Sequence, residues 1–215
     1  MGKLLLSQIG VVMPNNESIL YYSLPNLVIG FHGCSKSTFD SVIYEHDDLL
    51  VSKNSYDWLG HGIYFWENNY ERALLWAKNK FKKDAKVIGA IIDLGNCLNL
   101  TDYYSNNILK AGYNNLKAYY EMSGIELPHN SKKNKEGDVL LRPLDCAVIQ
   151  YIHKMREDAN YEAFDSVRGI FTEGDAVYPG SAFVEKTHVQ LCIVNPNCIK
   201  GYFVPRKEDM HHKKV

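Results

Sequence analysis

The sequence predicts a single α+β domain that spans residues 1–215. Apolar, strand-like runs occupy the first hundred residues, a helical stretch covers about 101–165, and strand-like runs return after it. Strands therefore flank a helical insertion and do not alternate regularly with helices, which favours α+β over a doubly wound sheet. A chain of 215 residues with 46% hydrophobic and 23% charged residues can bury a core and is too apolar to be disordered.

The first elements along the chain are a strand and a short helix. Residues 27–34 form an apolar run that reads as a buried strand. Residues 37–43 carry apolar side chains at helical spacing, and Ser37 is expected to cap that helix. Residues 48–58 follow as a loop that contains one short apolar strand.

A longer helix and a further strand come next. Residues 67–83 are predicted to be helical because their apolar side chains share one face: Tyr70, Ala73, Leu74, Ala77 and Phe81. Residues 86–95 read as a strand that ends at Gly95. Within the insertion, 144–155 has the clearest helical pattern, and 128–137 is a polar, lysine-rich loop. The last third is expected to hold strands at 166–172, 189–194 and 201–204.

Charge and cysteine usage exclude several classes of protein. The formal net charge is −1, so nothing overall favours nucleic-acid or membrane binding. Basic clusters at 78–83 and 132–135 are interpreted as a solvated helix face and a polar loop. The cysteines are odd in number, widely spaced and without a CxxC pair, which predicts neither a metal site nor a disulfide framework: Cys34, Cys97, Cys146, Cys192 and Cys198. The apolar residues near Met1 are too few for a secretory core, and no apolar run reaches membrane length, so a cytoplasmic protein is expected.

Two glycine-rich segments are the most informative part of the chain. They are Gly30-Phe31-His32-Gly33 and, about thirty residues later, Gly60-His61-Gly62-Ile63-Tyr64-Phe65. Glycine lets the backbone approach a ligand closely. A histidine held there can hydrogen-bond a sugar hydroxyl, and a tyrosine can offer its flat face to an aromatic ring. The two segments together predict a nucleotide pocket.

The pair resembles the donor-site signature of the ADP-ribosyltransferase superfamily, in its diphtheria-toxin and poly(ADP-ribose)-polymerase-like branch. The resemblance is strong over 28–77, fair over 186–203 and absent from most of the middle. It implies a fold of two small β-sheets split around an NAD cleft. It also implies NAD as the co-substrate, with no metal.

The resemblance also implies roles for individual residues. His32 would hydrogen-bond a ribose hydroxyl of NAD, and the Gly33 backbone would bind the nicotinamide amide. Tyr64 would stack on the nicotinamide ring, and Gly62 of the same motif would also take part in binding NAD. In that family a second aromatic residue, on the following helix, often packs on the other face of the nicotinamide ring. The nearest matching position in this chain is Leu75, and Trp76 is one residue further on, so Trp76 is a weaker candidate for this contact.

The third position of the signature departs from the family. There a glutamate begins a late strand and helps to stabilise the cationic transition state, and here the register places Gln190. Glu185 and Glu173 are carboxylates in the preceding loop that can substitute for it. A core strand residue bonded to a neighbouring loop is the alternative interpretation of Gln190. The missing glutamate argues against elongation of poly(ADP-ribose) and leaves single transfer open.

The expected function is mono-ADP-ribosylation of a protein or nucleic-acid acceptor, in a bacterial toxin or phage-defence effector with a neutralising antitoxin. By position, the loop over 173–186 corresponds to the family's acceptor-recognition loop. Two alternatives stay open. One is an NAD glycohydrolase, in which water replaces the acceptor, and the other is a non-catalytic module that binds NAD or ADP-ribose.

Overall fold

The computed structural model describes residues 27–131 and 141–211. The expectations for the N-terminal segment and for most of the loop over 128–137 lie outside these residues. The described chain has an α+β architecture with four α-helices and one sheet of seven strands. The helices are α1 (Lys36–Tyr44), α2 (Tyr70–Phe81), α3 (Ser105–Ser123) and α4 (Pro143–Asp158). The strands are β1 (Val28–Ser35), β2 (Ile63–Glu67), β3 (Ala85–Ile92), β4 (Cys97–Asn99), β5 (Ser166–Phe171), β6 (His188–Ile193) and β7 (Ile199–Phe203).

The sheet has the order β4-β5-β6-β2-β1-β3-β7, and all of its neighbouring strands are antiparallel except the β4–β5 pair. Hydrogen bonds thus join the strands into one sheet, in place of the two separate sheets that the resemblance implies. The junction is narrow, because β1 meets β2 only at two residue pairs, Gly30 with Glu67 and Phe31 with Trp66. β1 instead pairs with β3 along its whole length. Beyond Phe31 the two strands are free to separate.

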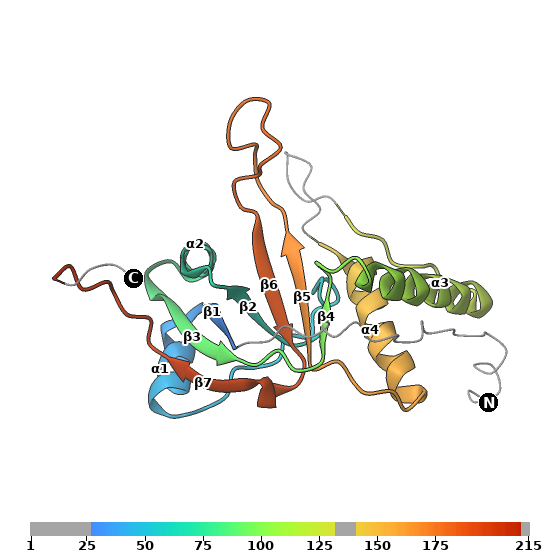
Figure 1. The fold of residues 1–215 in the computed structure, drawn as a ribbon, viewed down its shortest axis with the longest axis horizontal. Coiled ribbons are helices and arrows are strands. Elements are labelled where there is room, and N and C mark those ends of the chain that lie inside the picture. The colour runs from blue at the N-terminus through green and yellow to red at the C-terminus, as the bar shows by residue number, and fades with distance from the viewer. Residues whose placement is uncertain (1–26, 132–140, 212–215) are drawn as a thin grey trace.

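Helices cover the two ends of the sheet differently (Figure 1). α1 and α2 lie at the end formed by β1, β3 and β7, whereas α3 and α4 pack together beside β4 and β5. One group of buried side chains lies under α1, a small one lies under α2, and another joins α3 and α4 to the sheet. The predicted helical insertion is therefore present as a packed pair of helices at one end of the sheet.

Two local expectations differ from the structure. The side chain of Ser35, not Ser37, caps α1 by accepting a hydrogen bond from the Thr38 backbone. The stretch over 48–58 contains no strand, and only Ser52 forms an isolated bridge, to Gly62. β4 was not expected, since three residues are too few to show a strand pattern. None of the helices within 27–131 and 141–211 is both long and apolar enough to span a bilayer.

Candidate functional site

A cleft of about 560 Å³ opens where β1 and β2 separate. Its walls come from both strands, from α2, from the loop before β2, and from the facing ends of β5 and β6. The residues proposed from the sequence that line this cleft are His32, Gly33, Tyr64, Trp76, Glu173 and Gln190. Segments that are far apart in the chain thus converge on one cavity.

The pairing of β1 with β2 ends at Phe31, and the side chain of the next residue, His32, forms the following contact between the two strands. Its Nδ1 lies 2.8 Å from the Tyr64 carbonyl oxygen and donates to it, because a carbonyl can only accept. Burial lowers the pKa of His32 by more than the hydrogen bond to Tyr64 raises it, and the charge of Lys80 lowers it further, so the ring is neutral near pH 7. In a neutral ring that is protonated at Nδ1, Nε2 is a hydrogen-bond acceptor. The strand contact therefore fixes which nitrogen of His32 can accept a hydrogen bond from a ligand hydroxyl.

Tyr64 contributes its ring to the cleft but not its hydroxyl. The hydroxyl donates to the Gly60 carbonyl oxygen at 2.7 Å and accepts from the Leu59 backbone N–H at 3.1 Å. Burial is the main cause that raises the pKa of Tyr64 far above its usual range. Gly60 has a φ of 83°, a left-handed conformation that glycine adopts without strain. Tyr64 thus ties down the turn that precedes its own strand, and its flat face is what remains for a ligand.

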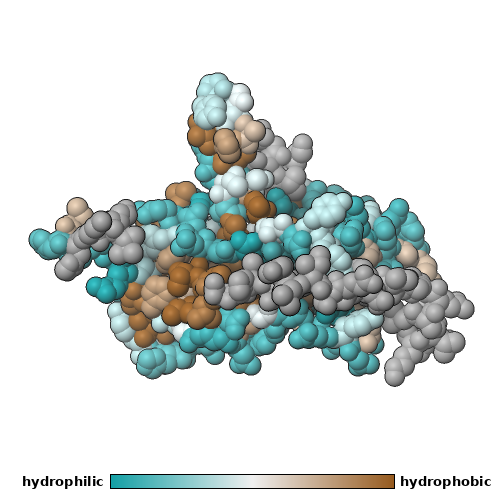
Figure 2. Space-filling model, viewed as in Figure 1, coloured by the Kyte–Doolittle hydropathy of each residue, from teal (hydrophilic) through white to brown (hydrophobic). Residues whose placement is uncertain are grey.

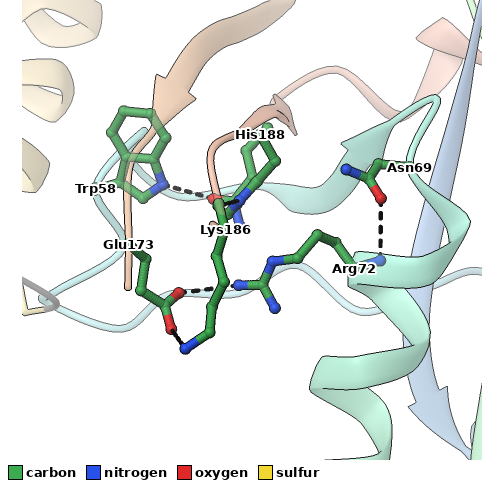
Figure 3. A network of polar contacts seen from close by, with 7 residues as sticks. Trp58, Asn69, Arg72, Glu173, Lys186 and His188 are labelled. Carbon is green, nitrogen blue, oxygen red and sulfur yellow. Dashed lines mark hydrogen bonds and ion pairs between the residues drawn. The ribbon is translucent and has the colours of Figure 1, made fainter. Parts of the chain in front are cut away.

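Gln190 is held by an indole ring. Its Oε1 accepts a hydrogen bond of 2.6 Å from Trp58 Nε1, a residue that also lines the cleft (Figure 3 shows Trp58). Because an indole N–H can only donate, this contact fixes the orientation of the Gln190 amide. The NH₂ group of the amide is therefore the donor available to a ligand, beside the second lone pair of Oε1.

Helix α2 supplies Trp76 and reaches the strand through Gly33. A side-chain carbon on Gly33 would lie 2.4 Å from the Ala73 carbonyl oxygen and 3.2 Å from the Trp76 ring. The centroid of the Trp76 ring lies 5.7 Å from that of the Trp66 ring. Lys80 Nζ lies over the Trp76 ring, 4.7 Å from its centroid. Leu75, the other candidate position, is 40% exposed and does not line the cleft.

Two of the proposed residues do not line the cleft. A side-chain carbon on Gly62 would lie 2.5 Å from Cys192 Sγ and 2.7 Å from the Ile193 carbonyl oxygen, so this glycine lets β2 pack closely on β6. Glu185 is exposed on the β5–β6 hairpin, where its backbone N–H bonds Asp175. The hairpin carboxylate that does line the cleft is Glu173.

Glu173 is shared between two cations (Figure 3). Its Oε2 accepts from Arg72 Nη2 at 2.9 Å, and its Oε1 lies 3.3 Å from Lys186 Nζ. Asn69 caps α2 by accepting from the Arg72 backbone N–H at 3.1 Å, which places Arg72 in the first turn of the helix. The Arg72 ion pair links the base of the hairpin to α2, and the Lys186 ion pair joins the two arms of the hairpin base.

Aromatic rings form the wall that the sequence analysis did not identify. Phe171 stacks on His188 at 5.6 Å and meets the edge of Trp58 at 5.2 Å, and Arg142 lies 4.3 Å above the Phe171 ring. His188 Nδ1 donates to the Lys186 carbonyl oxygen at 2.6 Å. Trp66 also lines the cleft. Of these residues, Trp66 alone could have been predicted from the sequence, because it lies two residues after Tyr64 and therefore shares the same face of the strand.

The cysteines have no catalytic character. Cys34 lines the cleft, but burial raises its pKa to about 11, so it is a thiol at neutral pH. All five cysteines fall in the described part of the chain and are free. Within that part, no group of three or more His, Cys, Asp or Glu side chains is arranged to hold a metal ion.

Comparison with known proteins adds one relative. The chain is 25% identical over 194 residues to an uncharacterized protein of Methanocaldococcus jannaschii, and the alignment covers 79% of this chain and 83% of that protein. No protein-family model and no solved structure matches the chain.

Proposed function

We propose that the protein is an NAD-dependent mono-ADP-ribosyltransferase, which transfers ADP-ribose from NAD to a protein or nucleic-acid acceptor and releases nicotinamide. One observation carries the proposal. The motif residues His32, Tyr64 and Gln190, with the weaker candidate Trp76, come from four separate elements and line the same cleft. A volume of about 560 Å³ lies within the range of ligand pockets.

In this proposal the polar groups meet the nicotinamide-bearing half of NAD. His32 Nε2 accepts from a ribose hydroxyl, and its Nδ1 bond to Tyr64 keeps that acceptor in place. The rings of Tyr64 and Trp76 contact the nicotinamide, whose amide bonds the Gly33 backbone. The Gln190 NH₂ donates to the ribose, since its oxygen is engaged by Trp58.

The reaction breaks the bond between the ribose C1′ atom and the nicotinamide nitrogen, which keeps the electron pair. The ribose passes through a state that resembles an oxocarbenium ion, an acceptor atom attacks C1′, and the acceptor proton leaves to solvent or a base. A glutamine supplies no negative charge to such a state, which weakens its stabilisation. Glu173 and Asp57 are the carboxylates that line the cleft. Single transfer, not chain elongation, is the activity that this composition supports.

The acceptor is expected to meet the hairpin that joins β5 to β6, which projects from the body of the molecule (Figures 1 and 2). Its far end exposes apolar side chains: Val177 at 54%, Tyr178 at 55% and Phe183 at 72%. The hairpin base carries Glu173 and therefore borders the cleft. A macromolecule that docks on this arm would approach C1′ of a bound NAD.

The proposal is tested with NAD labelled in its adenylate part, incubated with cell lysate and the protein. Label that moves onto the protein or nucleic-acid fraction is the expected result, and the fraction identifies the acceptor class. The negative control is the His32→Asn variant. Its asparagine amide can keep the bond to the Tyr64 carbonyl but has no acceptor at the position of Nε2. Free ADP-ribose without labelled macromolecules would identify a glycohydrolase instead.

A further inference from the structure

Three buried nitrogen atoms around the cleft have no hydrogen-bond partner among the described residues. They are Trp66 Nε1, Arg72 Nε and His188 Nε2, and each belongs to a residue that lines the cleft. Trp66 is 6% exposed and His188 is 5% exposed. A buried polar atom without a partner is energetically costly, so such atoms are rare unless a ligand or water completes them. Their gathering at one cavity marks a place built for a polar group.

The charges at this place are cationic in excess. Arg72 and Lys186 share the single carboxylate of Glu173, and Lys80 adds a further positive charge to the wall of the same cleft, from the last turn of α2. Glu173 divides its two oxygens between Arg72 and Lys186. Burial lowers the pKa of Arg72, and the charge of Glu173 offsets this lowering only in part. The buried guanidinium is thus incompletely compensated.

One edge of the Arg72 guanidinium is only half occupied. Arg72 donates to Glu173 through Nη2, while the Nε–H beside it has no partner in the described chain. These two N–H groups form the side of the arginine fork that binds an oxyanion through two parallel hydrogen bonds. The second oxygen of Glu173 binds Lys186, so Glu173 does not form both of these hydrogen bonds with Arg72.

From these contacts we propose that Arg72, Lys186, Trp66 and His188 form a phosphate-binding subsite, which Glu173 occupies as an internal substitute until a phosphorylated ligand displaces it. Arg72 then binds two phosphate oxygens through Nε and Nη2, and Lys186 and the Trp66 indole donate to the remaining oxygens. His188 donates through Nε2 when it takes up a proton beside the phosphate.

The charge balance favours phosphate over a carboxylate ligand. A ligand carboxylate would replace one negative charge by another and gain nothing over Glu173. A phosphate or diphosphate carries about two negative charges near neutral pH, which matches the cationic excess better. Its three or more oxygens also suit the two unpartnered donors, Trp66 Nε1 and Arg72 Nε, together with Arg72 Nη2 and the Lys186 ammonium. The Glu173 side chain sits on a hairpin loop, so it can leave without moving a strand.

This inference depends on the charges of the cleft and not on NAD cleavage, although the diphosphate of NAD is one group that would suit it. The first probe is inorganic pyrophosphate, with its dissociation constant measured by titration calorimetry. We expect Glu173→Gln to bind pyrophosphate roughly tenfold more tightly than the wild type, because the internal competitor is gone. A gain of affinity cannot arise from misfolding, so this variant needs no folding control.

Two further variants sharpen the result. Glu71→Gln removes the same charge from an exposed neighbour of Arg72, and its affinity should match that of the wild type. Arg72→Lys keeps the charge but lacks the fork, and we expect it to weaken binding several-fold with an unchanged melting temperature. Equal pyrophosphate binding in the wild type, Glu173→Gln and Arg72→Lys would overturn the proposal. An increase that Glu71→Gln reproduces would also overturn it, since the effect would then be one of overall charge.

The same titration identifies the source of the phosphate. ADP-ribose carries an internal diphosphate, AMP carries a terminal phosphate, and adenosine carries none. We expect adenosine to have the same dissociation constant for the wild type and Glu173→Gln. One of the phosphorylated ligands should bind Glu173→Gln more tightly than it binds the wild type. If ADP-ribose gains, the subsite holds the diphosphate of the dinucleotide, and if AMP gains, it holds a phosphate monoester. Gain for neither contradicts the subsite, whatever the outcome for NAD cleavage.

Discussion

Three polar side chains of the cleft each use one hydrogen-bonding atom to hold themselves in place. His32 and His188 donate through Nδ1 to backbone carbonyls, and Gln190 accepts from Trp58. The atom that remains on each residue is thereby chemically defined: an acceptor on a neutral histidine and a donor on the glutamine. Such pre-organised groups need little rearrangement when a ligand binds, which is a common property of catalytic sites.

At Gln190 this arrangement makes a specific prediction. In Gln190→Glu, one carboxylate oxygen can keep the Trp58 bond while the other brings negative charge to the ribose. We expect nicotinamide release to be preserved or raised by up to roughly tenfold, because charge complementary to the transition state lowers the barrier. The measurement is initial-rate nicotinamide release at saturating NAD.

Gln190→Leu is the companion variant, since it removes both the Trp58 bond and the polar group. It should release nicotinamide more slowly than the wild type. A folded Gln190→Glu protein that loses activity together with Gln190→Leu would mean that the site needs the amide donor of Gln190 and gains nothing from a negative charge there, which contradicts the expected rate.

Sequence reasoning identified several cleft-lining residues inside the two glycine-rich segments, but it did not identify Trp58 or Arg72, which tertiary contacts bring to the cleft. His32, Gly33 and Tyr64 lie in local motifs, and all of them line the cleft. Trp58 and Arg72 have no distinguishing local pattern. They become neighbours of Gln190 and Glu173 only because β6 pairs with β2 and the hairpin returns toward α2. Such proximity is a tertiary property that one sequence does not display.

At the level of elements, α2 is the part that most directly builds the cleft. Its first turn presents Arg72, and Trp76 and Lys80 follow on the same side. The helix can lie this close to β1 because Gly33 has no side chain in the space between them. The motif glycine thus has a packing role in addition to the ligand contact inferred from the sequence.

Gly33→Ala tests this packing. The added carbon would meet the Ala73 carbonyl oxygen at 2.4 Å, so the helix must shift. We expect a loss of about 1–3 kcal/mol in the free energy of unfolding and weaker binding of NAD. Urea unfolding measures the first effect. Gly201→Ala is the control, since nothing lies within 4 Å of the added carbon there, and its stability should match the wild type. Equal stability of both variants would contradict the close packing of α2 on β1.

The helix and strand boundaries were predictable where the pattern was long. α2, α4, β1 and β3 were expected close to their observed bounds. The cap of α1 was misassigned because Ser35 and Ser37 stand two residues apart and both suit the role, so only the observed bond to Thr38 decides. Short elements such as β4 form because a neighbouring strand is already in place.

For the whole molecule, the main difference from expectation is the sheet. Seven strands share one hydrogen-bonded sheet, and only its narrow β1–β2 junction gives it a divided character. Strand order depends on long-range pairing, which hydrophobic periodicity does not encode. The helical insertion was expected from its pattern, and its position at the β4 end follows from apolar contacts with that edge of the sheet.

The buried histidines predict how stability depends on pH. Burial, and then the charge of Arg156, lowers the pKa of His153 from 6.5 to about 4, and burial lowers the pKa of His32 and His188 as well. The unfolded chain therefore binds more protons than the folded one in this range, so stability falls as the pH drops from about 6.5 toward 4. His153 alone accounts for at most about 3 kcal/mol.

Urea unfolding at pH 7.5, 6 and 5 measures this dependence. In His153→Gln the side chain no longer titrates, so we expect the fall in stability between pH 7.5 and 5 to shrink. An identical slope in the wild type and His153→Gln would show that His153 is not held neutral by the fold.

The central claim, that this cleft cleaves NAD, is tested most directly by nicotinamide release from the wild type, His32→Asn and His61→Ala, with and without lysate. His61 lies in the second glycine-rich segment but does not line the cleft, which makes it the matched control. We predict release by the wild type and His61→Ala, and a loss of at least about 100-fold in His32→Asn. Undiminished release by a folded His32→Asn protein, or no release by the wild type in either condition, would contradict the claim.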